Sequence, residues 1–218
     1  MTLQTCIFIL LFIFSFSRYL NQVQIDAIDK LIEERMESVK LNKFGIVIVN
    51  STSIIHQKVF GEGITTKSLF PLASVTKSFT ALGILKLGIP LNQTIEKFNL
   101  GKFIDDDLAK KITVKDLLSH SSGLAKASPK QEVKKGEFLY SNYGYSLLGK
   151  IIEDQSQEKN YGEYIKNHIL DELDMIDSGT DYVDDFMDSY DNFFGFLTKY
   201  RGLESEFTLD NGWDIPAG

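Results

Sequence analysis

Cysteine and positive charge are both scarce in this sequence of 218 residues. The single cysteine, Cys6, cannot form a disulfide within the chain, so stability has to come from an apolar core. Lysine and arginine number 23 against 30 aspartates and glutamates, and the net charge of -7 argues against nucleic acid or an anionic membrane surface as a partner. A hydrophobic share of 43% is that of an ordinary globular protein, and the length allows one large domain or two small ones.

Several catalytic motifs are also absent. The sequence has no Gly-x-Ser-x-Gly, no His-Glu-x-x-His and no phosphate-binding loop, which excludes an α/β-hydrolase, a zinc protease of that type and a P-loop nucleotide-binding protein. His56 and His168 fall in a predicted strand and a predicted helix, where surface or packing roles account for them. A cluster of aspartates at helical spacing has no glycine-centred calcium loop, so we interpret it as a solvated helix face; its members are Asp181, Asp184, Asp185 and Asp188.

The most apolar run lies at the amino terminus, from Cys6 to Phe16, and is too short for a comfortable transmembrane helix. Two small residues, Ser15 and Ser17, resemble a signal-peptidase site, although no lysine or arginine precedes the run. We therefore predict a signal peptide over residues 1–17 that is cleaved after Ser17, with an uncleaved membrane anchor as the alternative. Either interpretation places the protein outside the cytoplasm, secreted or membrane-associated.

Hydrophobic periodicity predicts an α+β protein with a sheet at one end and a helical part after it. An amphipathic helix is expected over residues 24–40, followed by two β-branched strands, Phe44–Asn50 and Ser53–Phe60, that form a hairpin. The other predicted elements are helices: one from Ser74 to about Gly88, a short one capped by Thr113 and Asp116 and stopped by Gly123, one from about Asn142, and one over Tyr161–Met175.

The stretch FPLASVTKSFTALGILKL contains the start of the helix at Ser74. We expect this helix to bury an apolar stripe formed by Val75, Phe79, Leu82 and Leu85. Its first turn nevertheless carries a hydroxyl and an amine three residues apart, Ser74 and Lys77, on neighbouring faces of the helix. A role as the N-cap residue would explain the serine, but it leaves the lysine unexplained.

Lys77 lies in the first turn of the predicted helix, where a positive charge is unfavourable. The positive end of the helix dipole opposes its charge, and burial in an apolar setting would disfavour the charge further. Both effects favour a neutral amine, which can act as a general base beside a serine hydroxyl. We therefore predict that Ser74 is a nucleophile and that Lys77 takes its proton. A second such pair, Ser156 and Lys159, lies in the polar stretch EDQSQEKN, where solvation alone explains it.

Three motifs, in order along the chain, resemble one family. ASVTKSFTALGILKL, ITVKDLLSHSSGL and FLYSNYGYSLLGKIIE look like segments of the β-lactamase-related serine hydrolases, the class C branch of the serine β-lactamases and penicillin-binding proteins. The resemblance covers residues 24–218 and implies a partial domain of the β-lactamase/transpeptidase-like fold, a sheet flanked by helices plus a helical subdomain. It also implies an acyl-enzyme mechanism on an amide or ester of a small molecule or peptide, with no metal or organic cofactor.

The resemblance implies roles for four residues. Ser74 would be acylated, Lys77 would assist its activation, Tyr140 would be a second acid/base group, and Asn142 would bind the substrate amide or carbonyl. Which of the lysine and the tyrosine acts as the base stays open. Without the resemblance, Tyr140 would be interpreted as a packing aromatic and Asn142 as a helix cap. The stretch HSSG, beginning at His120, stands where members commonly show His-Thr-Ser-Gly, and we interpret it as a structural turn near the site.

One motif of the family is missing. No Lys/His-Ser/Thr-Gly follows Asn142, although the family carries it on a later strand that lines the cleft. The same region would supply one backbone amide of the oxyanion hole, and loss of one such donor typically costs about 10²–10³ in rate. We therefore expect either a fragment that lacks the later sheet strands or a catalytically inactive paralogue that acts as a binding or scaffold protein.

Overall fold

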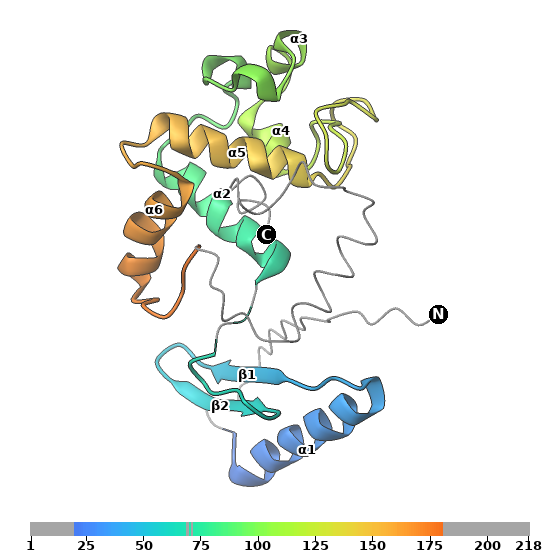
Figure 1. Cartoon of the computed structure of the whole chain (residues 1–218), viewed down its shortest axis with the longest axis vertical. Coiled ribbons are helices and arrows are strands. Elements are labelled where there is room, and N and C mark those ends of the chain that lie inside the picture. The colour runs from blue at the N-terminus through green and yellow to red at the C-terminus, as the bar shows by residue number, and fades with distance from the viewer. Residues whose placement is uncertain (1–19, 69, 71, 181–218) are drawn as a thin grey trace. The chain divides into compact units, whose positions relative to one another are not determined.

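The computed structural model describes residues 20–68, 70 and 72–180, which fall into two compact units, 20–68 and 70–180 (Figure 1). The first unit contains one helix and a two-stranded sheet, and the second contains helices and loops. The predicted α+β class is confirmed.

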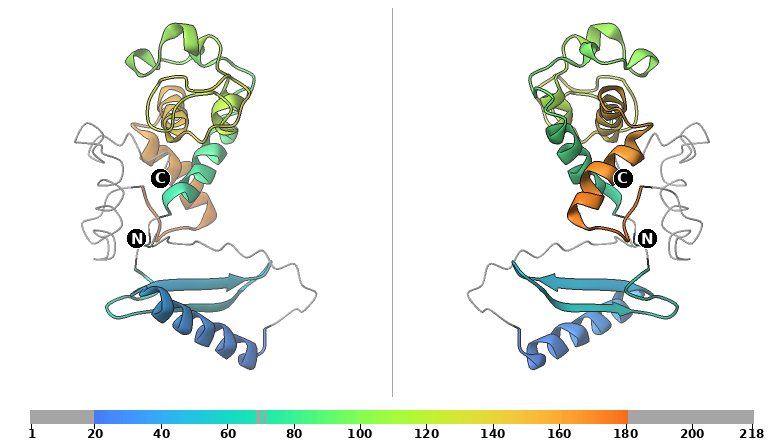
Figure 2. Two further views of the ribbon diagram at one scale, coloured as in Figure 1. Left: turned by 90° about the vertical axis from the view of Figure 1, so that its right-hand side faces the viewer. Right: turned by 90° about the vertical axis from the view of Figure 1, so that its left-hand side faces the viewer.

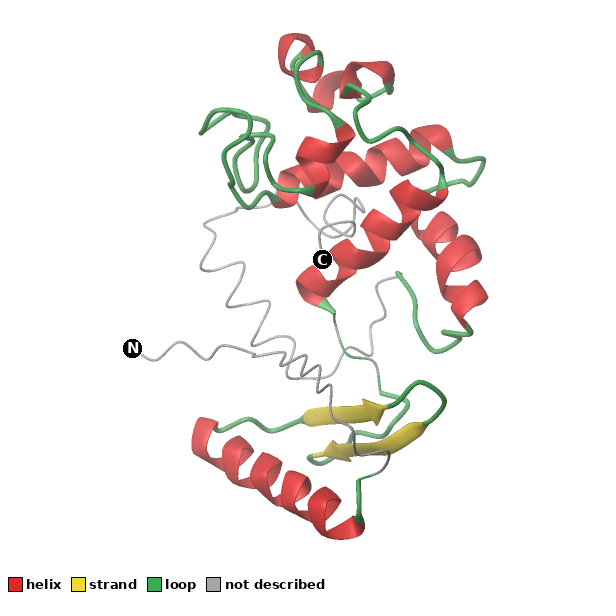
Figure 3. Ribbon diagram, turned by 180° about the vertical axis from the view of Figure 1, so that it is seen from behind, coloured by secondary structure: helices red, strands yellow, loops and turns green. Residues whose placement is uncertain are grey.

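The first unit is a helix packed along a hairpin (Figure 3). Helix α1 spans Gln22–Val39 and begins two residues earlier than expected, because Asn21 caps it. Strands β1 (Phe44–Val49) and β2 (Ile54–Phe60) pair antiparallel, as predicted. The helix is joined to the sheet through Asp29, whose two carboxylate oxygens lie 2.8 Å from the ring of His56 and 2.8 Å from the ammonium of Lys58. His56 therefore has the packing role that we expected.

The second unit is built around one buried helix, α5 (Asn142–Gln155). All residues from 142 to 149 are buried, and α2, α4 and α6 pack against it (Figure 2). Full burial of a large aliphatic side chain stabilises a fold by roughly 1.5–3 kcal/mol, so α5 contributes substantially to the stability of this unit. The other elements are η1 (Ala73–Val75), α2 (Thr76–Lys86), η2 (Ile95–Lys97), η3 (Gly101–Phe103), α3 (Asp106–Ala109), α4 (Val114–Leu118), α6 (Tyr161–Ile165), η4 (Lys166–Leu170) and η5 (Asp171–Leu173).

The predicted buried stripe of α2 is wrong in part. Leu82 is 43% exposed and Leu85 is 56% exposed. The face that is buried instead carries Lys77, Thr80, Gly83 and Ile84. A β-carbon at Gly83 would lie 3.0 Å from the side chain of Ile152 on α5, so the glycine marks the point of close helix contact. Apolar residues occur on nearly every side of α2, and the neighbouring helices decide which of them are buried.

The end of α4 also differs from the prediction. The capping box of Thr113 and Asp116 is present, but the left-handed residue that ends the helix is His120, with φ 55°, and not Gly123. The amide of Ser121 donates to the carbonyl of Asp116 at 2.8 Å, which closes the terminus as a Schellman motif. Gly123 does have φ +79°, but its function is close packing, since a β-carbon there would lie 2.3 Å from the carbonyl oxygen of Val133.

The helix predicted over Tyr161–Met175 is confirmed, but the segment contains three kinds of helical turn. An α-helical turn, a π-helical turn and a 3₁₀ turn follow one another as α6, η4 and η5. The segment ends at Asp174, which is left-handed with φ 54°. His168 lies 2.9 Å from Glu158 and stacks on Tyr164, in the surface and packing role that we expected.

Two sequence predictions fall outside the described residues: the segment 1–17 and the aspartate cluster that begins at Asp181. Within the part of the chain that the structure describes, no helix has the length and apolar character needed to cross a membrane. The same residues contain no group of three or more histidine, cysteine or carboxylate side chains arranged to hold a metal ion.

Candidate active site

Ser74 lies at a kink in front of helix α2. The preceding residue, Ala73, has φ 45°, a left-handed conformation that costs a residue with a side chain roughly 1–2 kcal/mol. Ser74 itself is exposed and lies in the short 3₁₀ turn η1. Neither η1 nor α2 has a side-chain cap, so the alternative interpretation of Ser74 as an N-cap is wrong. Backbone strain of this kind concentrates at functional sites.

Three of the predicted site residues meet at one oxygen atom. The phenol of Tyr140 donates to Ser74 Oγ at 2.6 Å, and the ammonium of Lys77 donates to the same Oγ at 3.3 Å. Tyr140 is 66 residues away from Ser74 along the chain. The fold therefore brings together a hydroxyl and two groups that can exchange its proton.

Lys77 is buried beneath two aromatic rings. Only 7% of the residue is exposed, and its ammonium lies 4.9 Å from the ring centre of Tyr140 and 5.5 Å from that of Tyr145. Both ring faces favour the positive charge, which opposes the effect of the helix dipole. From the sequence, only the dipole and burial could be weighed, since neither ring is a neighbour of Lys77 along the chain.

Tyr145 is a site residue that the sequence argument missed. Burial raises the pKa of Tyr145, and the neighbouring Tyr140 raises it further, so the phenol stays neutral. Its hydroxyl donates to the carbonyl of Leu118 at 3.0 Å, which holds the ring in place over Lys77. The available signal was the repeat of tyrosines in YSNYGY, which puts several rings at one helix start.

Asn142 is the first residue of α5, directly behind Tyr140 and Ser141. The N-cap is Ser141, whose hydroxyl accepts from the amide of Gly144 at 2.9 Å, so the cap interpretation of Asn142 is wrong. The residue is 7% exposed, and its Oδ1 has no hydrogen-bond partner among the described residues. An unpaired buried acceptor costs about 1–3 kcal/mol and is unusual in folded proteins. Its Oδ1 therefore makes no hydrogen bond to Ser74, Lys77 or Tyr140.

His120 is the second residue that the sequence argument did not place in the site. Its ring centre is 4.4 Å from that of Tyr140 and 5.1 Å from that of Tyr145. Burial lowers the pKa of His120, and the charge of Lys77 lowers it further, so its ring is neutral. The stretch HSSG is thus a turn, as predicted, but a turn whose first side chain packs inside the aromatic cluster of the site.

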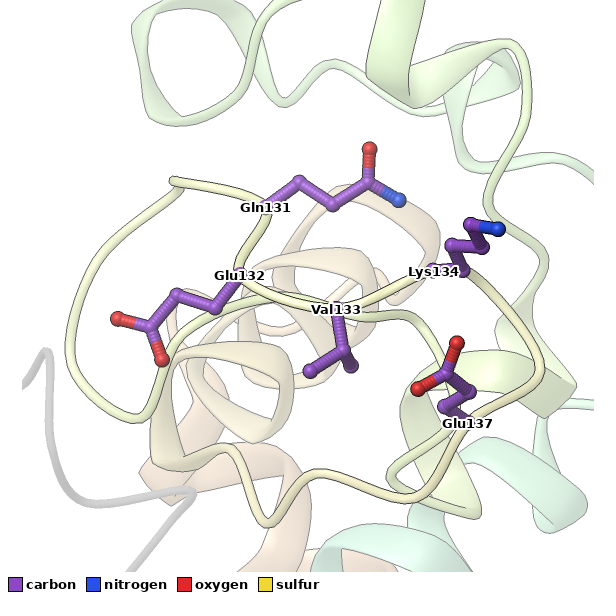
Figure 4. Close-up of a pocket in the computed structure, with 5 residues that line it drawn as sticks. All are labelled: Gln131, Glu132, Val133, Lys134 and Glu137. Carbon is purple, nitrogen blue, oxygen red and sulfur yellow. The ribbon is translucent and has the colours of Figure 1, made fainter.

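A hollow of about 460 Å³ occurs in the loop that precedes Tyr140 (Figure 4). Its lining residues are Gln131, Glu132, Val133, Lys134 and Glu137. None of the predicted site residues lines it, and only one of its five side chains is apolar. Small-molecule sites are mainly apolar with a few polar groups, so we assign this hollow no role in the chemistry.

Comparisons with known proteins agree on one family. A sequence model described as Beta-lactamase matches residues 28–191, more than half of the chain. Beta-lactamase-like protein 4 of Dictyostelium discoideum is 26% identical over 88% of this chain and 42% of its own length. Protein flp of Staphylococcus aureus (strain MW2) is 28% identical over 68% of this chain and 36% of its own length.

Solved structures agree with the sequence comparisons. An octameric penicillin-binding protein homologue from Pyrococcus abyssi matches with a TM-score of 0.60 and 31% identity, over 69% of this chain and 43% of that one. A β-lactamase/D-alanine carboxypeptidase from Yersinia pestis matches in fold, with a TM-score of 0.60 and 18% identity, over 74% of this chain and 56% of that one. The chain thus spans 42% and 36% of the two curated relatives. On the sequence match, the chain belongs to the β-lactamase family.

Proposed function

We propose that this chain is a serine hydrolase that forms an acyl-enzyme with an amide or ester. The observation that carries the proposal is the convergence of Tyr140 Oη at 2.6 Å and Lys77 Nζ at 3.3 Å on the exposed Oγ of Ser74. A serine hydroxyl is a weak nucleophile until a neighbouring base removes its proton. Both candidate bases lie within reach of that proton, as general-base catalysis requires.

The reaction would proceed in two stages. One member of the pair must first lose its own proton, as a Tyr140 phenolate or a neutral Lys77 amine; Ser74 Oγ then attacks the carbonyl carbon while its proton passes to that group, which next protonates the departing amine or alcohol. Water enters in the second stage, loses a proton to the unprotonated member of the pair and attacks the acyl carbon; the proton then passes to Ser74 Oγ as the bond to the acyl group breaks and the acid is released. Tyr140 is the nearer of the two groups to Ser74 Oγ, at 2.6 Å against 3.3 Å for Lys77.

The unpaired oxygen of Asn142 supports an amide as the preferred substrate. Its Oδ1 is buried without a partner among the described residues, and an amide oxygen has two lone pairs that can accept hydrogen bonds. A substrate amide N–H would satisfy this acceptor, whereas an ester offers no donor at the equivalent position. A small amide or a peptide therefore suits the site better than a simple ester. The similarity to a penicillin-binding protein homologue from Pyrococcus abyssi makes a penicillin the first compound to test.

Trapping of the acyl-enzyme tests the proposal. We expect incubation with a fluorophosphonate to add one phosphonyl group per chain, and tandem mass spectrometry to locate it on Ser74. A penicillin should form an adduct at the same residue. A modified chain with the label on another residue, or no adduct with either reagent, would contradict the proposal.

A second candidate is a non-catalytic binding protein of the same family. It is the alternative that the sequence analysis left open, and membership of the β-lactamase family is compatible with it. Such a protein would be acylated at Ser74 at most once and would not release the product. A burst of one equivalent of chromophore without further turnover would identify this candidate, whereas steady release after the burst would identify the hydrolase.

We also propose that the protein acts outside the cytoplasm, as a secreted or membrane-anchored protein. The support is the apolar run from Cys6 to Phe16 and the small residues Ser15 and Ser17. Expressed in a secretory host, the protein should lose its first 17 residues, or remain in the membrane fraction if the run is an anchor. Intact-mass measurement checks this. Recovery of a soluble cytosolic product that retains Cys6 would contradict both interpretations.

A further inference from the structure

His120 holds the residues on both sides of Tyr140. Its backbone carbonyl accepts from the amide of Leu139 at 2.8 Å, and its ring Nδ1 accepts from the amide of Ser141 at 3.1 Å. The imidazole also lies against the phenol ring itself, with 4.4 Å between the ring centres. His120 therefore binds the residue before Tyr140 and the residue after it, and its imidazole packs against the Tyr140 ring.

This arrangement depends on the unusual backbone of His120. Its φ of 55° is left-handed, and it lies at the position after the cap of α4 where glycine is the common choice. Histidine is one of the few side chains enriched in this conformation, although the conformation still has a cost. A glycine would end the helix equally well but would have no ring. The structure therefore retains a strained residue at a position where its side chain contacts Tyr140.

We propose that His120 is a positioning residue that holds the hydroxyl of Tyr140 against Ser74. This inference rests on the proposed function, because Tyr140 matters only if it exchanges the proton of the nucleophile. The path is short and continuous: His120 Nδ1 binds the Ser141 amide, Ser141 caps α5, and Tyr140 directly precedes that cap. A displacement of about 1 Å at a reacting group can cost on the order of 10²-fold in rate.

The role requires an imidazole with Nδ1 unprotonated and the proton on Nε2. The charged and titratable groups facing the ring are Lys77 on α2, Tyr140 in the segment before α5 and Tyr145 on α5. Phe138 contacts its edge and is uncharged. A second proton would remove the acceptor for Ser141 and place a cation close to Lys77. Acid should therefore release Tyr140 before the fold as a whole is lost.

The sign of the stability effect follows from linkage. Because burial and Lys77 hold the pKa of His120 below its usual 6.5, the unfolded chain takes up this proton first as the pH falls. The stabilisation is fully present above pH 6.5 and is lost as the pH falls through the lower pKa of the folded state. His120→Asn should lack this part of the pH dependence.

Three substitutions separate the contributions of His120. His120→Gly removes ring and acceptor but suits the left-handed backbone, so the variant should fold. His120→Asn also tolerates this backbone, and its Oδ1 lies close to the place of Nδ1, so it restores the bond to Ser141 without the ring. His120→Phe keeps a ring and lacks the acceptor.

We expect the rate constant for fluorophosphonate labelling of Ser74 at saturating reagent to fall about 10²-fold in the glycine variant. The half-saturating concentration should change little, and asparagine should recover part of the rate.

The pH profile is the measurement that a merely structural role would not alter. The labelling rate of the wild-type protein should fall on the acid side as His120 is protonated, and the asparagine variant should lose that limb. A glycine variant with the rate and pH profile of the wild-type protein would overturn the proposal.

Nitrogen-15 NMR provides a readout that does not require activity. The chain has three histidines, so the ring signals of His120 are assigned by their loss in His120→Asn. We expect the Nε2–H tautomer, a pKa below the usual value, and a Ser141 amide that exchanges faster with solvent in His120→Gly. A proton on Nδ1 at neutral pH would overturn the proposal. Absence of any labelling in the wild-type protein, with these NMR signatures intact, would instead show that the proposed hydrolase function is wrong.

Discussion

Ser74→Ala should abolish labelling by fluorophosphonate and reduce hydrolysis to the background rate. Removal of the nucleophile from a serine hydrolase costs on the order of 10⁶-fold in kcat, because no neighbouring group can form the covalent intermediate. Ser74 is exposed, and its hydroxyl only accepts the bonds from Tyr140 and Lys77, so the fold should tolerate the change. The measurements are the labelling rate, the hydrolysis rate and a melting curve for each variant.

Ser78→Ala is the matched control. Ser78 lies in the same helix, next to Lys77, and is exposed, so its loss should change neither labelling nor melting. Undiminished labelling of Ser74→Ala would show that another residue is the nucleophile. Equal loss of labelling in both variants would show that the helix has been disturbed and that the site assignment is wrong.

Lys77→Arg and Tyr140→Phe should each lower the labelling rate of Ser74 by about 10²–10⁴-fold, the usual contribution of a general acid or base. Arginine stays protonated and cannot accept the proton of the serine. Phenylalanine keeps the ring that covers Lys77 and contacts His120, and it removes only the oxygen that lies 2.6 Å from Ser74 Oγ. The two variants therefore remove one proton-exchanging group each and leave the other in place.

Tyr143→Phe is the control for the tyrosine variant. Tyr143 lies in the first turn of α5, but its hydroxyl donates to the carbonyl of Phe103, away from the three site residues. The substitution should leave the labelling rate unchanged and lower only the melting temperature. If Tyr140→Phe is labelled at the wild-type rate, its oxygen takes no part in activating Ser74, and Lys77 alone would have to supply the base.

The sequence was sufficient for features that depend on neighbours along the chain. The hairpin of β1 and β2 follows from two β-branched runs and a short turn, and the start of α4 follows from its capping box. Ser74 and Lys77 also belong here, because a spacing of three residues puts them side by side in any helix. Their meeting in the structure, with 3.3 Å between Lys77 Nζ and Ser74 Oγ, needed no distant contact.

Other features depended on distant contacts and were predicted wrongly or missed. Leu82 and Leu85 form an apolar stripe in the sequence, yet α2 turns Lys77, Thr80 and Gly83 inward because α5 and α6 pack there. The sequence predicted that Gly123 ends α4 in the left-handed conformation, because glycine is the usual residue there. In the structure the left-handed residue is His120. A glycine is favoured by local sterics alone, whereas His120 makes contacts to residues about twenty positions further along the chain.

The sequence by itself thus determined the secondary structure of most elements, the family resemblance, and the pair Ser74 and Lys77, because propensity, capping and helical spacing act over a few residues. Only the tertiary structure decided how the site is completed. It brought Tyr140 from 66 residues away to Ser74, put Tyr145 over Lys77, placed His120 against Tyr140, and left the oxygen of Asn142 buried without a partner among the described residues. The physical reason is that packing around α5 fixes these positions, and burial sets which side chains stay neutral and which acceptors remain unpaired.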